Sequence, residues 1–477
     1  MSDELPKGWA RAPLAKLSQP TRPRRNPQAY PRLPFVGMEQ VESQTRRLLG
    51  TLSSSEMKST AFHFQPGDVL YGRLRPYLNK VLRADIEGLC SSEFIVLPPQ
   101  STFEPSYLAF YLGTDGFVTF ANQLNQGDRP RVRYDQIADH EIPLPPLAEQ
   151  RRIVAKLETL LGKVDASQQR LAKIPVLLKR FHQSILAAAC SGRLTADWRE
   201  ENPATESANV LLAKIKERRL ATVQTKKEKV QIEEVFDERN LRVDEGDLGL
   251  DEIPDTWLSC RVGAIGAVCN GSTPSRKQPE FWDGTIPWVS SGEVRNNLIS
   301  ETRERITKAG YDGSSVRLLP RGSVLIAMIG EGKTRGQAAI LNIEATINQN
   351  IAAVVLDHGL LSSVYLWRWF QLQYAATRER GGGSGPQALN CQRVRELPFV
   401  LPPLPEQQEI VRRVEELFAL ADPLDLRLAK ARSQVDKLRP SLLARAFAGK
   451  LVPQDPNDEP AEKLLDRIRV KSKGAGR

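Results

Sequence analysis

Hydrophobic residues recur with an alternating spacing of four and three in two stretches of the chain, residues 153–185 and 410–442. Of the 20 positions on this spacing, 19 are apolar, and Ser167 is the exception. A seam of this length is typical of helices that pack along each other in a left-handed coiled coil. The predicted seam includes Ile153, Leu157, Leu160, Val164, Leu171 and Leu178 in the first helix and Ile410, Val414, Leu417, Leu428, Val435 and Leu438 in the second.

We expect the two seams to pair with each other as an antiparallel spacer. At about 1.5 Å per residue, each seam would reach roughly 48 Å. The alternative is that each helix packs only against its own neighbouring domain. Pro175, Pro423 and Pro440 complicate the picture, because an interior proline costs ~3 kcal/mol or kinks a helix. Asp422 followed by Pro423 is also typical of a helix start, which leaves open whether the second stretch is one helix or two.

The two helical stretches belong to an internal repeat with an offset of 257 residues. Leu144-Pro-Pro-Leu-Ala-Glu-Gln150 returns as Leu401-Pro-Pro-Leu-Pro-Glu-Gln407, and 21 of the 51 positions from 144 to 194 are identical between the copies. The copies end similarly, at Gly192-Arg-Leu194 and Gly449-Lys-Leu451. A shorter echo follows, in which Ala208, Leu211, Leu212 and Ile215 match Ala461, Leu464, Leu465 and Ile468. Because a long repeat of this kind reflects repeated structure, the chain is predicted to contain two copies of one plan.

The blocks that precede each helical copy echo one another more faintly. Leu33-Pro-Phe-Val36 parallels Ile286-Pro-Trp-Val289, and Pro66-Gly-Asp-Val-Leu70 resembles Arg321-Gly-Ser-Val-Leu325. Both blocks are rich in proline, glycine and short β-branched or aromatic runs, which indicates short strands, loops and a few helices. The predicted class is α+β, with two similar mixed α/β domains alternating with two long helical segments in a pseudo-two-fold arrangement. The expected boundaries are 1–142 and 251–398 for the domains, and 143–250 and 399–477 for the helical segments with their linker and tail.

Composition limits the classes of protein to be considered. The chain has 477 residues, of which 40% are hydrophobic and 26% charged, and its longest apolar runs are too short to span a membrane. The N-terminus does not resemble a secretory signal, so a cytoplasmic location is expected. Five cysteines without a CxxC pair and four scattered histidines indicate neither a disulfide framework nor a zinc site.

Two unlike blocks, each followed by a helix entered through Leu-Pro-Pro-Leu-x-Glu-Gln, resemble the specificity subunit of type I restriction-modification enzymes. The resemblance covers nearly the whole chain and is carried by the helix entries at 143–150 and 400–407, the glycine-rich stretches at 126–131 and 381–386, and the exits at Gly192 and Gly449. It implies that two target-recognition domains each read half of a split, asymmetric site in double-stranded DNA, and that the helices set the gap between the halves.

The same resemblance implies partners and a division of chemistry. The subunit would dock two methyltransferase subunits and, for cleavage, two motor-nuclease subunits, with no membrane partner. This chain would be non-catalytic and bind no cofactor itself. S-adenosylmethionine, ATP and Mg²⁺ would be used by the partner subunits.

The formal net charge of +10 fits a polyanion partner, although a solvated surface is the alternative for any single basic cluster. Arginine, lysine, asparagine and glutamine read base edges bidentately, whereas most other polar contacts position a protein on phosphate. Side chains of these types in glycine- or proline-rich loops are therefore the candidates for DNA contacts. They are Arg73, Arg75, Arg129 and Arg131 in the first domain and Lys333, Arg335, Gln387 and Asn390 in the second.

Three catalytic patterns fail on inspection. Residues 327–334 fit a relaxed phosphate-loop pattern, but Gly336 and an expected strand at 338–341 stand where a helix is needed. No Asn- or Asp-Pro-Pro-aromatic loop is present to hold a flipped base for methyl transfer. Asp68 and Glu93 have the separation of a nuclease acidic pair, but Ile95 stands where the lysine should be.

Two other functional classes stay open on the residues alone. One is a coiled-coil scaffold that binds proteins rather than DNA, and the other is a self-sufficient enzyme. Salt-dependent binding to duplex DNA would argue against the scaffold, because phosphate contacts release counterions. Activity of the purified chain with S-adenosylmethionine or ATP alone would support the enzyme.

Overall fold

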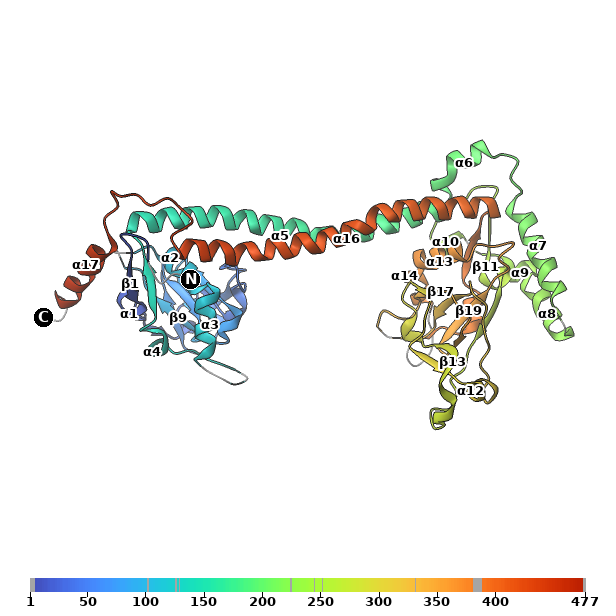
Figure 1. Ribbon diagram of the computed structural model, residues 1–477, viewed down its shortest axis with the longest axis horizontal. Helices are drawn as coiled ribbons and strands as arrows, with labels where there is room; N and C mark the ends of the chain where they lie inside the picture. The colour runs from blue at the N-terminus through green and yellow to red at the C-terminus, as the bar shows by residue number, and fades with distance from the viewer. Residues whose placement is uncertain are drawn as a thin grey trace. The chain divides into compact units, whose positions relative to one another are not determined.

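The computed structural model describes residues 5–100, 103–124, 127, 129–223, 225–243, 245–250, 252–330, 332–380 and 388–474, apart from the side chains of residues 227, 245 and 468–474. The chain forms two compact units. Unit 1 comprises Met1–Lys173 and Arg427–Arg477, and unit 2 comprises Ile174–Leu426. Each unit contains one domain together with part of the long helix α5 (Leu147–Cys190) and part of the long helix α16 (Leu404–Phe447) (Figure 1).

The domain of unit 1 is built from short strands and four helices. Its sheets have the orders β2-β5-β8-β3-β4, β7-β6-β9 and β1-β10. The strands are β1 (Ala10–Pro13), β2 (Arg24–Arg25), β3 (Pro34–Val36), β4 (Leu52–Ser53), β5 (Ala61–Phe64), β6 (Val69–Gly72), β7 (Val81–Arg83), β8 (Gly88–Cys90), β9 (Phe94–Leu97) and β10 (Glu141–Leu144). The helices are α1 (Leu14–Leu17), α2 (Pro105–Leu112), α3 (Asp115–Gln123) and α4 (Tyr134–Ile137).

The domain of unit 2 has sheets of the same sizes with orders β12-β19-β16-β17-β14, β15-β13-β18 and β11-β20. Its strands are β11 (Leu258–Arg261), β12 (Ala267–Asn270), β13 (Trp282–Val289), β14 (Leu298–Ile299), β15 (Glu304–Ile306), β16 (Val324–Ala327), β17 (Ala338–Leu341), β18 (Thr346–Ile347), β19 (Ile351–Val355) and β20 (Pro398–Leu401). Its helices are α11 (Val262–Ile265), α12 (Lys308–Asp312), α13 (Ser363–Leu372), α14 (Tyr374–Glu379) and α15 (Cys391–Arg395).

The faint echoes between the two blocks correspond to equivalent strands. The similarity of residues 33–36 to residues 286–289 aligns β3 with β13 in sequence. Each of these strands pairs in parallel with a short strand, β3 with β8 and β13 with β18. The second echo places β6 and β16 in register, and each lies between two antiparallel neighbours. The predicted α+β class with two similar mixed domains and two long helices is therefore confirmed.

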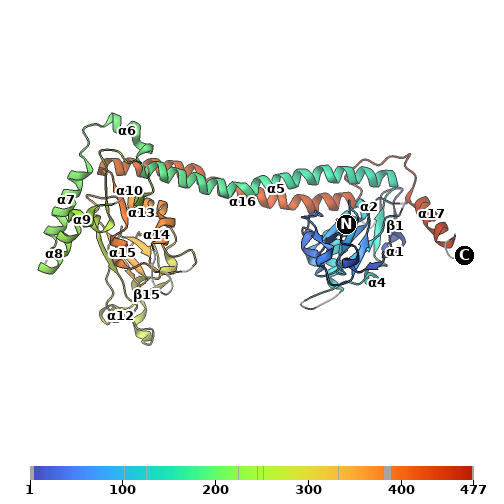
Figure 2. The same ribbon diagram turned by 180° about the vertical axis from the view of Figure 1, so that it is seen from behind.

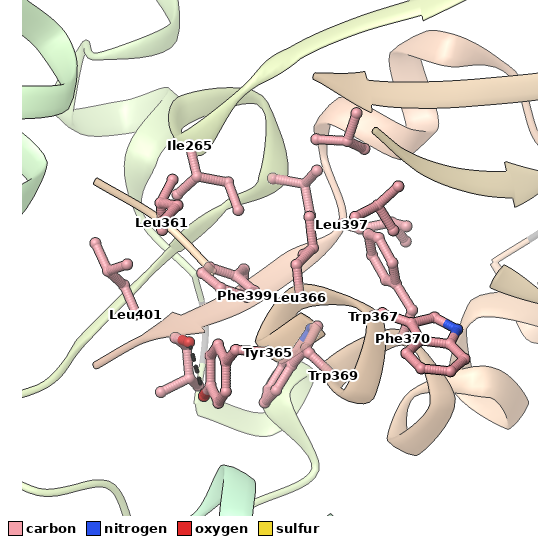
Figure 3. Packing of buried hydrophobic residues seen from close by; sticks show 14 of the residues in the cluster. Ile265, Leu361, Tyr365, Leu366, Trp367, Trp369, Phe370, Leu397, Phe399 and Leu401 are labelled. Atoms are coloured by element: carbon pink, nitrogen blue, oxygen red, sulfur yellow. Dashed lines mark hydrogen bonds between the residues drawn. The ribbon is translucent and has the colours of Figure 1, made fainter. Parts of the chain in front are cut away.

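Aromatic side chains fill the core of the second domain. Figure 3 shows Tyr365 and Trp369 of α13 against Phe399 of β20, and both ring pairs have centroids 5.8 Å apart. The two α13 residues lie four apart, so they share one helix face, and neither is exposed. Burial of each such ring contributes roughly 1.5–3 kcal/mol. This face fixes α13 against the strand that leads into α16.

The Leu-Pro-Pro-Leu-x-Glu-Gln motif locks each domain to its long helix. In unit 1, Glu149 is 1% exposed and its Oε2 accepts a hydrogen bond of 3.0 Å from the indole of Trp9. Gln150 is fully buried; it donates to the carbonyl of Pro145 at 2.9 Å and accepts from the backbone N–H of Glu104 at 2.9 Å. The motif therefore joins the start of the domain, the start of α2 and the end of β10 to the first turn of α5.

The second copy of the motif makes the same contacts in unit 2. Oε2 of Glu406 accepts from the indole of Trp257 at 2.7 Å, and Gln407 donates to the carbonyl of Pro402 at 2.8 Å. Gln407 also accepts from the backbone N–H of Ser362 at 2.9 Å. The hydrogen bonds to the indole, to the proline carbonyl and to the start of the domain helix are thus repeated in both units.

Each long helix ends on the domain of the other copy of the repeat. Gly192, after α5, has φ +77°, and a Cβ there would lie 2.4 Å from Pro254. Gly449, after α16, has φ +68°, and a Cβ there would lie 2.3 Å from Pro6. Glycine is required at both exits, because the left-handed conformation and the close proline exclude other residues. The chain leaving α5 therefore joins the second domain, and the chain leaving α16 returns to the first.

The helices that follow these exits complete the two domains. The backbone N–H of Ala208, at the start of α7 (Ala208–Ala221), donates to the carbonyl of Thr256 at 3.0 Å. The N–H of Ala461, at the start of α17 (Ala461–Gly474), donates to the carbonyl of Gly8 at 2.9 Å. Figure 2 shows α7 with α8 (Lys226–Val235) and α9 (Glu238–Leu241) along one flank of the second domain. The remaining short helices of this linker are α6 (Ala196–Glu201) and α10 (Glu245–Leu248).

Within unit 1, the first part of α5 runs antiparallel to the last part of α16. Asp165 forms an ion pair with Arg439, and the carbonyl of Leu171 accepts from Arg432 at 3.0 Å, so partner numbers fall along α16 as they rise along α5. Within unit 2, the His182 ring lies 4.5 Å from that of Phe418. The seam positions near the domains are buried. Ile153 belongs to the core of the first domain and Ile410 to that of the second.

Farther along the helices the predicted seam is only partly buried. Leu160, Leu171, Leu178, Leu417 and Val435 are half-buried, and Leu417 packs against the core of the second domain. Leu438 is 45% exposed, so the strict spacing placed it on the packed face wrongly. Both earlier alternatives are therefore correct in part, since the helices pack against their own domains and also along each other.

The open question about the prolines is answered by two continuous helices. Helix α16 runs from Leu404 to Phe447 through Pro423 and Pro440, and α5 contains Pro175. A proline leaves the carbonyl four residues earlier without its helical donor. For Pro175 that carbonyl belongs to Leu171, which accepts instead from the guanidinium of Arg432. The start that Asp422 and Pro423 suggested is not used.

The two motif glutamates are expected to differ in how much stability is lost when each is replaced by glutamine. Oε1 of Glu406 accepts from Thr195 and Arg199, whereas Oε1 of Glu149 is buried without a hydrogen-bond donor among the described residues. Burial raises the pKa of Glu149, against the opposing effects of the Trp9 hydrogen bond and the Arg152 charge. A raised carboxyl pKa means that the folded state holds the proton more tightly, so stability from protonation is present below this pKa and is lost as the pH rises through it.

We therefore expect Glu149→Gln to change the free energy of unfolding at pH 7 by less than about 1 kcal/mol, because one unpartnered group replaces another. Glu406→Gln should cost on the order of 2–3 kcal/mol, because it removes the charge that faces Arg199. Urea unfolding of both variants at pH 7 and pH 5 measures these changes. As the pH falls, the free energy of unfolding of the wild type should rise relative to that of Glu149→Gln. Equal losses in the two variants would contradict the assignment.

Candidate nucleic-acid interface

The structure brings the four candidate residues of the first domain together. Arg73 and Arg75 lie in the loop between β6 and β7, and Arg129 and Arg131 lie in the segment before α4. The backbone N–H of Arg75 donates to the carbonyl of Pro130 at 2.8 Å, and Leu74 forms an isolated antiparallel bridge with Arg131. Two basic segments more than 50 residues apart in sequence thus form one surface element.

The guanidinium groups of Arg73 and Arg75 have no partner among the residues that the structure describes. Both side chains are half-buried, and neither makes an ion pair or a hydrogen bond with any residue that the structure describes. Their Nε atoms are buried, which costs about 1–3 kcal/mol for each unsatisfied donor. Arg75 also has a left-handed backbone, with φ 52°. An external acceptor such as a phosphate or a base edge would satisfy these donors.

The neighbouring arginines differ from this pair. Arg131 forms a bidentate ion pair with Glu93, with distances of 3.1 and 2.8 Å, and this hydrogen bonding raises the pKa of Arg131. Arg129 is exposed. A DNA contact by Arg131 would therefore have to compete with Glu93, whereas Arg129 faces solvent.

The second domain places its candidates on the equivalent loop. Lys333 and Arg335 lie between β16 and β17, and the backbone N–H of Leu389 donates to the carbonyl of Met328 at 3.0 Å. This bond corresponds to that between Val132 and Arg73 in the first domain, also 3.0 Å. The antiparallel pairing of β16 with β17 confirms the strand expected at 338–341 in the place where a phosphate loop would need a helix.

The individual candidates of the second domain are placed differently from one another. Lys333 is exposed, and its carbonyl accepts from the hydroxyl of Tyr374 at 2.6 Å. Arg335 is only 7% exposed, so its side chain is covered. Asn390 is exposed and caps α15, since its Oδ1 accepts from the backbone N–H of Arg393 at 2.8 Å. Gln387 lies outside the described residues, as do most residues of the two glycine-rich stretches.

The structure also separates basic residues that serve the fold. Arg22 forms a bidentate pair with Asp68, with distances of 2.8 and 2.7 Å, and the Asp68 side chain is fully buried. Asp68 and Glu93, the acidic pair considered for a nuclease, are thus each held by an arginine, Arg22 and Arg131.

One exposed arginine was missed by the sequence reasoning. Arg276 lies 3.6 Å over the ring of Trp282 and pairs with Glu304, and its hydrogen bond lowers the pKa of Glu304. About half of its side chain is exposed. The segment Ser-Thr-Pro-Ser-Arg276-Lys meets the same criterion of a basic residue in a proline-rich loop, and could have been found by it.

Comparison with known proteins assigns the two domains. Residues 14–176 and 254–424 match the family model of the type I restriction modification DNA specificity domain. The chain belongs to this family. Each matched segment contains most of one of the two domains and the first part of the long helix that follows it. The family recognised from the paired helix entries is therefore confirmed.

Curated relatives are type I restriction enzyme specificity subunits. The EcoBI subunit of Escherichia coli is 28% identical over 362 residues, which cover 71% of this chain and 66% of that subunit, just under two thirds of its length. The StySPI subunit of Salmonella potsdam is 28% identical over 406 residues, covering 80% of this chain and 74% of the relative.

Two solved structures share the fold. A chain from a study of complex assembly and conformational transition of the type I R-M system has a TM-score of 0.66 at 19% identity, covering 94% of this chain and 99% of its own. The HsdS subunit from Thermoanaerobacter tengcongensis has a TM-score of 0.55 at 21% identity, with the same coverage of both chains. In the described part of this specificity-family chain, no helix is long and apolar enough to cross a membrane.

The contrast between Arg75 and Arg22 predicts separable effects. Arg75→Met removes a guanidinium without a protein partner, so the melting temperature should stay close to that of the wild type. Affinity for duplex DNA should fall, and the slope of log K against log salt should decrease by about one if Arg75 contacts a phosphate. Titrations at several salt concentrations measure both quantities.

The matched control is Arg22→Met, which leaves the buried Asp68 carboxylate unpaired. It should cost about 3–5 kcal/mol of stability. Unchanged DNA affinity in Arg75→Met would remove this residue from the interface.

Proposed function

We propose that this chain is the DNA-reading subunit of a type I restriction-modification complex. Each domain would read one half of a split, asymmetric DNA site, and the paired helices would set the number of unread bases between the halves. The observation that carries the proposal is the placement of basic candidates on the equivalent hairpin loop of both domains. Loops on a repeated scaffold can differ in sequence while the surrounding fold stays constant.

The proposed division of the chain follows the repeat. Residues 1–142 and 251–398 would be the recognition domains, and residues 143–250 and 399–477 the helical segments. Arg73 and Arg75 are the strongest DNA candidates, because their buried donors have no acceptor in the described part of the chain. Lys333 and Arg129 are exposed candidates. Arg131, Arg335 and Asn390 would either change conformation to contact DNA or contact it while keeping their present interactions.

The chain is proposed to be non-catalytic and to bind no cofactor. Two methyltransferase subunits would dock on it and supply S-adenosylmethionine chemistry, and two motor-nuclease subunits would supply ATP- and Mg²⁺-dependent cleavage. The family assignment supports this division, and so do the occupied carboxylates, since Asp68 and Glu93 are committed to arginine partners.

Reconstitution tests this function. The purified chain with S-adenosylmethionine and DNA should transfer no methyl groups, and the methyltransferase subunit alone should also be inactive. The combined subunits should methylate one asymmetric, interrupted sequence, which sequencing of modified bases identifies. Transfer by the pure chain, or salt-independent association with DNA, would refute the proposal.

A fragment of residues 1–250 provides a second test. It carries one domain, α5 and α7, and α7 begins with the same docking bond that α17 makes to the first domain. In a dimer of the fragment, α7 of each copy could therefore take the place of α17 on the other copy. We expect a two-fold dimer that places two copies of the first domain in opposite orientations.

With the methyltransferase subunit, this dimer should methylate an interrupted palindrome built from the first half-site alone. Light scattering gives the mass, and mapping of methylated bases gives the site. A stable monomer, or methylation at the original asymmetric site, would contradict the two-fold plan.

A further inference from the structure

Each long helix carries two repeated carboxylates. Glu158 and Asp165 on α5 correspond to Glu415 and Asp422 on α16 at the offset of 257, and both positions are identical in the two copies. None of the four is a member of the apolar seam. Asp165 pairs with Arg439 across the two helices, whereas Glu158, Glu415 and Asp422 form no ion pair among the described residues.

In unit 1 these carboxylates face an arginine of the recognition domain. The guanidinium of Arg46 lies 3.9 Å from the centroid of the Phe110 ring on α2. Burial lowers the pKa of Arg46 to about 9; the charge of Arg439 also lowers it, and Asp165 and Glu158 oppose both effects. The ring contact of Arg46 thus lies within the domain, and its link to the long helices in unit 1 is electrostatic.

The loop that presents Arg46 is held in a strained conformation. Gln44 and Arg46 have φ values of 66° and 61°, and Asn79 has φ 48°. The backbone N–H of Gln44 donates to the carbonyl of Asn79 at 3.0 Å, and the amide of Asn79 donates back to Oε1 of Gln44 at 3.0 Å. Left-handed backbone of this kind costs of order 1–3 kcal/mol per residue and persists where surrounding contacts impose it. Asn79 ends the same β6–β7 loop that contains Arg75.

In unit 2 the repeated carboxylates also face an arginine, but it comes from a different place. The guanidinium of Arg368 on α13 lies 4.8 Å from the centroid of the Phe418 ring on α16. Burial lowers the pKa of Arg368, and the charges of Glu415 and Asp422 oppose this effect. The same two kinds of group, an arginine and a phenylalanine, thus meet beside the same two carboxylates.

The origins of the two groups are exchanged between the units. Phe110 and Arg368 occupy equivalent positions, three residues after Tyr107 and Tyr365, whose hydroxyls donate to the carbonyls of Pro143 and Val400. The domain helix provides the ring in unit 1 and the arginine in unit 2. Phe418 corresponds in the repeat to Leu161, so the ring on the long helix is present only where the domain supplies no ring.

We propose that Arg46 and Arg368 are positioning residues that fix the orientation of each recognition domain on its long helix and thereby define which spacing between half-sites is modified. This inference rests on the proposed function. Helix length alone sets a coarse distance, whereas a domain that tilts on its helix would tolerate neighbouring spacings. In unit 2, Arg368 resists such tilting, because its contact with Phe418 joins the domain to the long helix and would be lost together with the two nearby carboxylates. In unit 1, a tilt would withdraw the guanidinium of Arg46 from the charges of Glu158 and Asp165.

The test uses the complex of the full chain with its methyltransferase subunit. Duplexes carry both native half-sites separated by the native number of bases, or by one or two more or fewer. In Arg46→Met and in Arg368→Met, the preference for the native spacing over its neighbours should fall on the order of tenfold, close to the worth of one desolvated cation–π contact. The preferred bases within each half-site should stay unchanged.

Two substitutions probe the rings with little loss of apolar volume. Phe418→Leu reproduces the residue found at Leu161, and Phe110→Leu removes the ring under Arg46; both should relax the spacing as the arginine variants do. Arg47→Met and Arg412→Met are controls, because both arginines are exposed and neither stacks on a ring in the described structure. Melting curves of every variant establish that the chain is folded.

The outcomes distinguish the roles. A wild-type spacing profile in folded Arg46→Met, Arg368→Met and Phe418→Leu overturns the positioning role. Altered base preference overturns it as well, since that would make the arginine a DNA contact, and so does an equal loss of rate at all spacings, which is a purely structural effect. A wild-type complex that methylates no split site would refute the proposed function instead.

Discussion

The buried carboxylate at the start of each long helix, with the indole that donates to it, is the contact on which each domain depends. Glu149 and Glu406 accept from Trp9 and Trp257, while the adjacent glutamines join three further backbone segments. Burying an ionised group is expensive unless it is paired, so these contacts tolerate little displacement. A large displacement of a domain on its helix must break these contacts, so the motif fixes where each domain is attached, while small tilts are resisted by the contacts around it.

Stability and recognition are consequently assigned to different residues. The contacts of the Leu-Pro-Pro-Leu-x-Glu-Gln motif, the glycines Gly192 and Gly449, and the first hydrogen bonds of α7 and α17 are repeated in both units. None of these residues lies in the β6–β7 or β16–β17 loops. The fold does not require partners for Arg73 and Arg75, which have none among the described residues, because the Arg22–Asp68 pair and the aromatic cores stabilise it. A scaffold of this kind tolerates exchange of loop sequence at little cost in stability.

Much of this arrangement could be predicted from the sequence, because both copies of a repeated pattern must be compatible with the same structure. The helix entries, the exits, the strand at 338–341 and the placement of basic residues in loops all follow from local patterns. The continuity of α16 through Pro423 did not, because proline statistics describe isolated helices. The same limit applies to Pro175 in α5, where the freed carbonyl of Leu171 accepts from Arg432, a residue more than 250 positions away in the sequence. The cap formed by Asn390 and the burial of Arg335 also depend on tertiary contacts that no local pattern contains.

Arginine shows most clearly why residue type alone does not assign a role. Arg22 neutralises a buried aspartate, Arg46 and Arg368 stack on rings beside helix carboxylates, and Arg75 has no acceptor among the described residues. The guanidinium is the same in each case, and the difference lies in whether a carboxylate or a ring is within reach. A net charge of +10 therefore says little about DNA binding until the internally paired arginines are set aside. Arg73 and Arg75 are donors with no partner among the described residues, and phosphates or base edges would satisfy them.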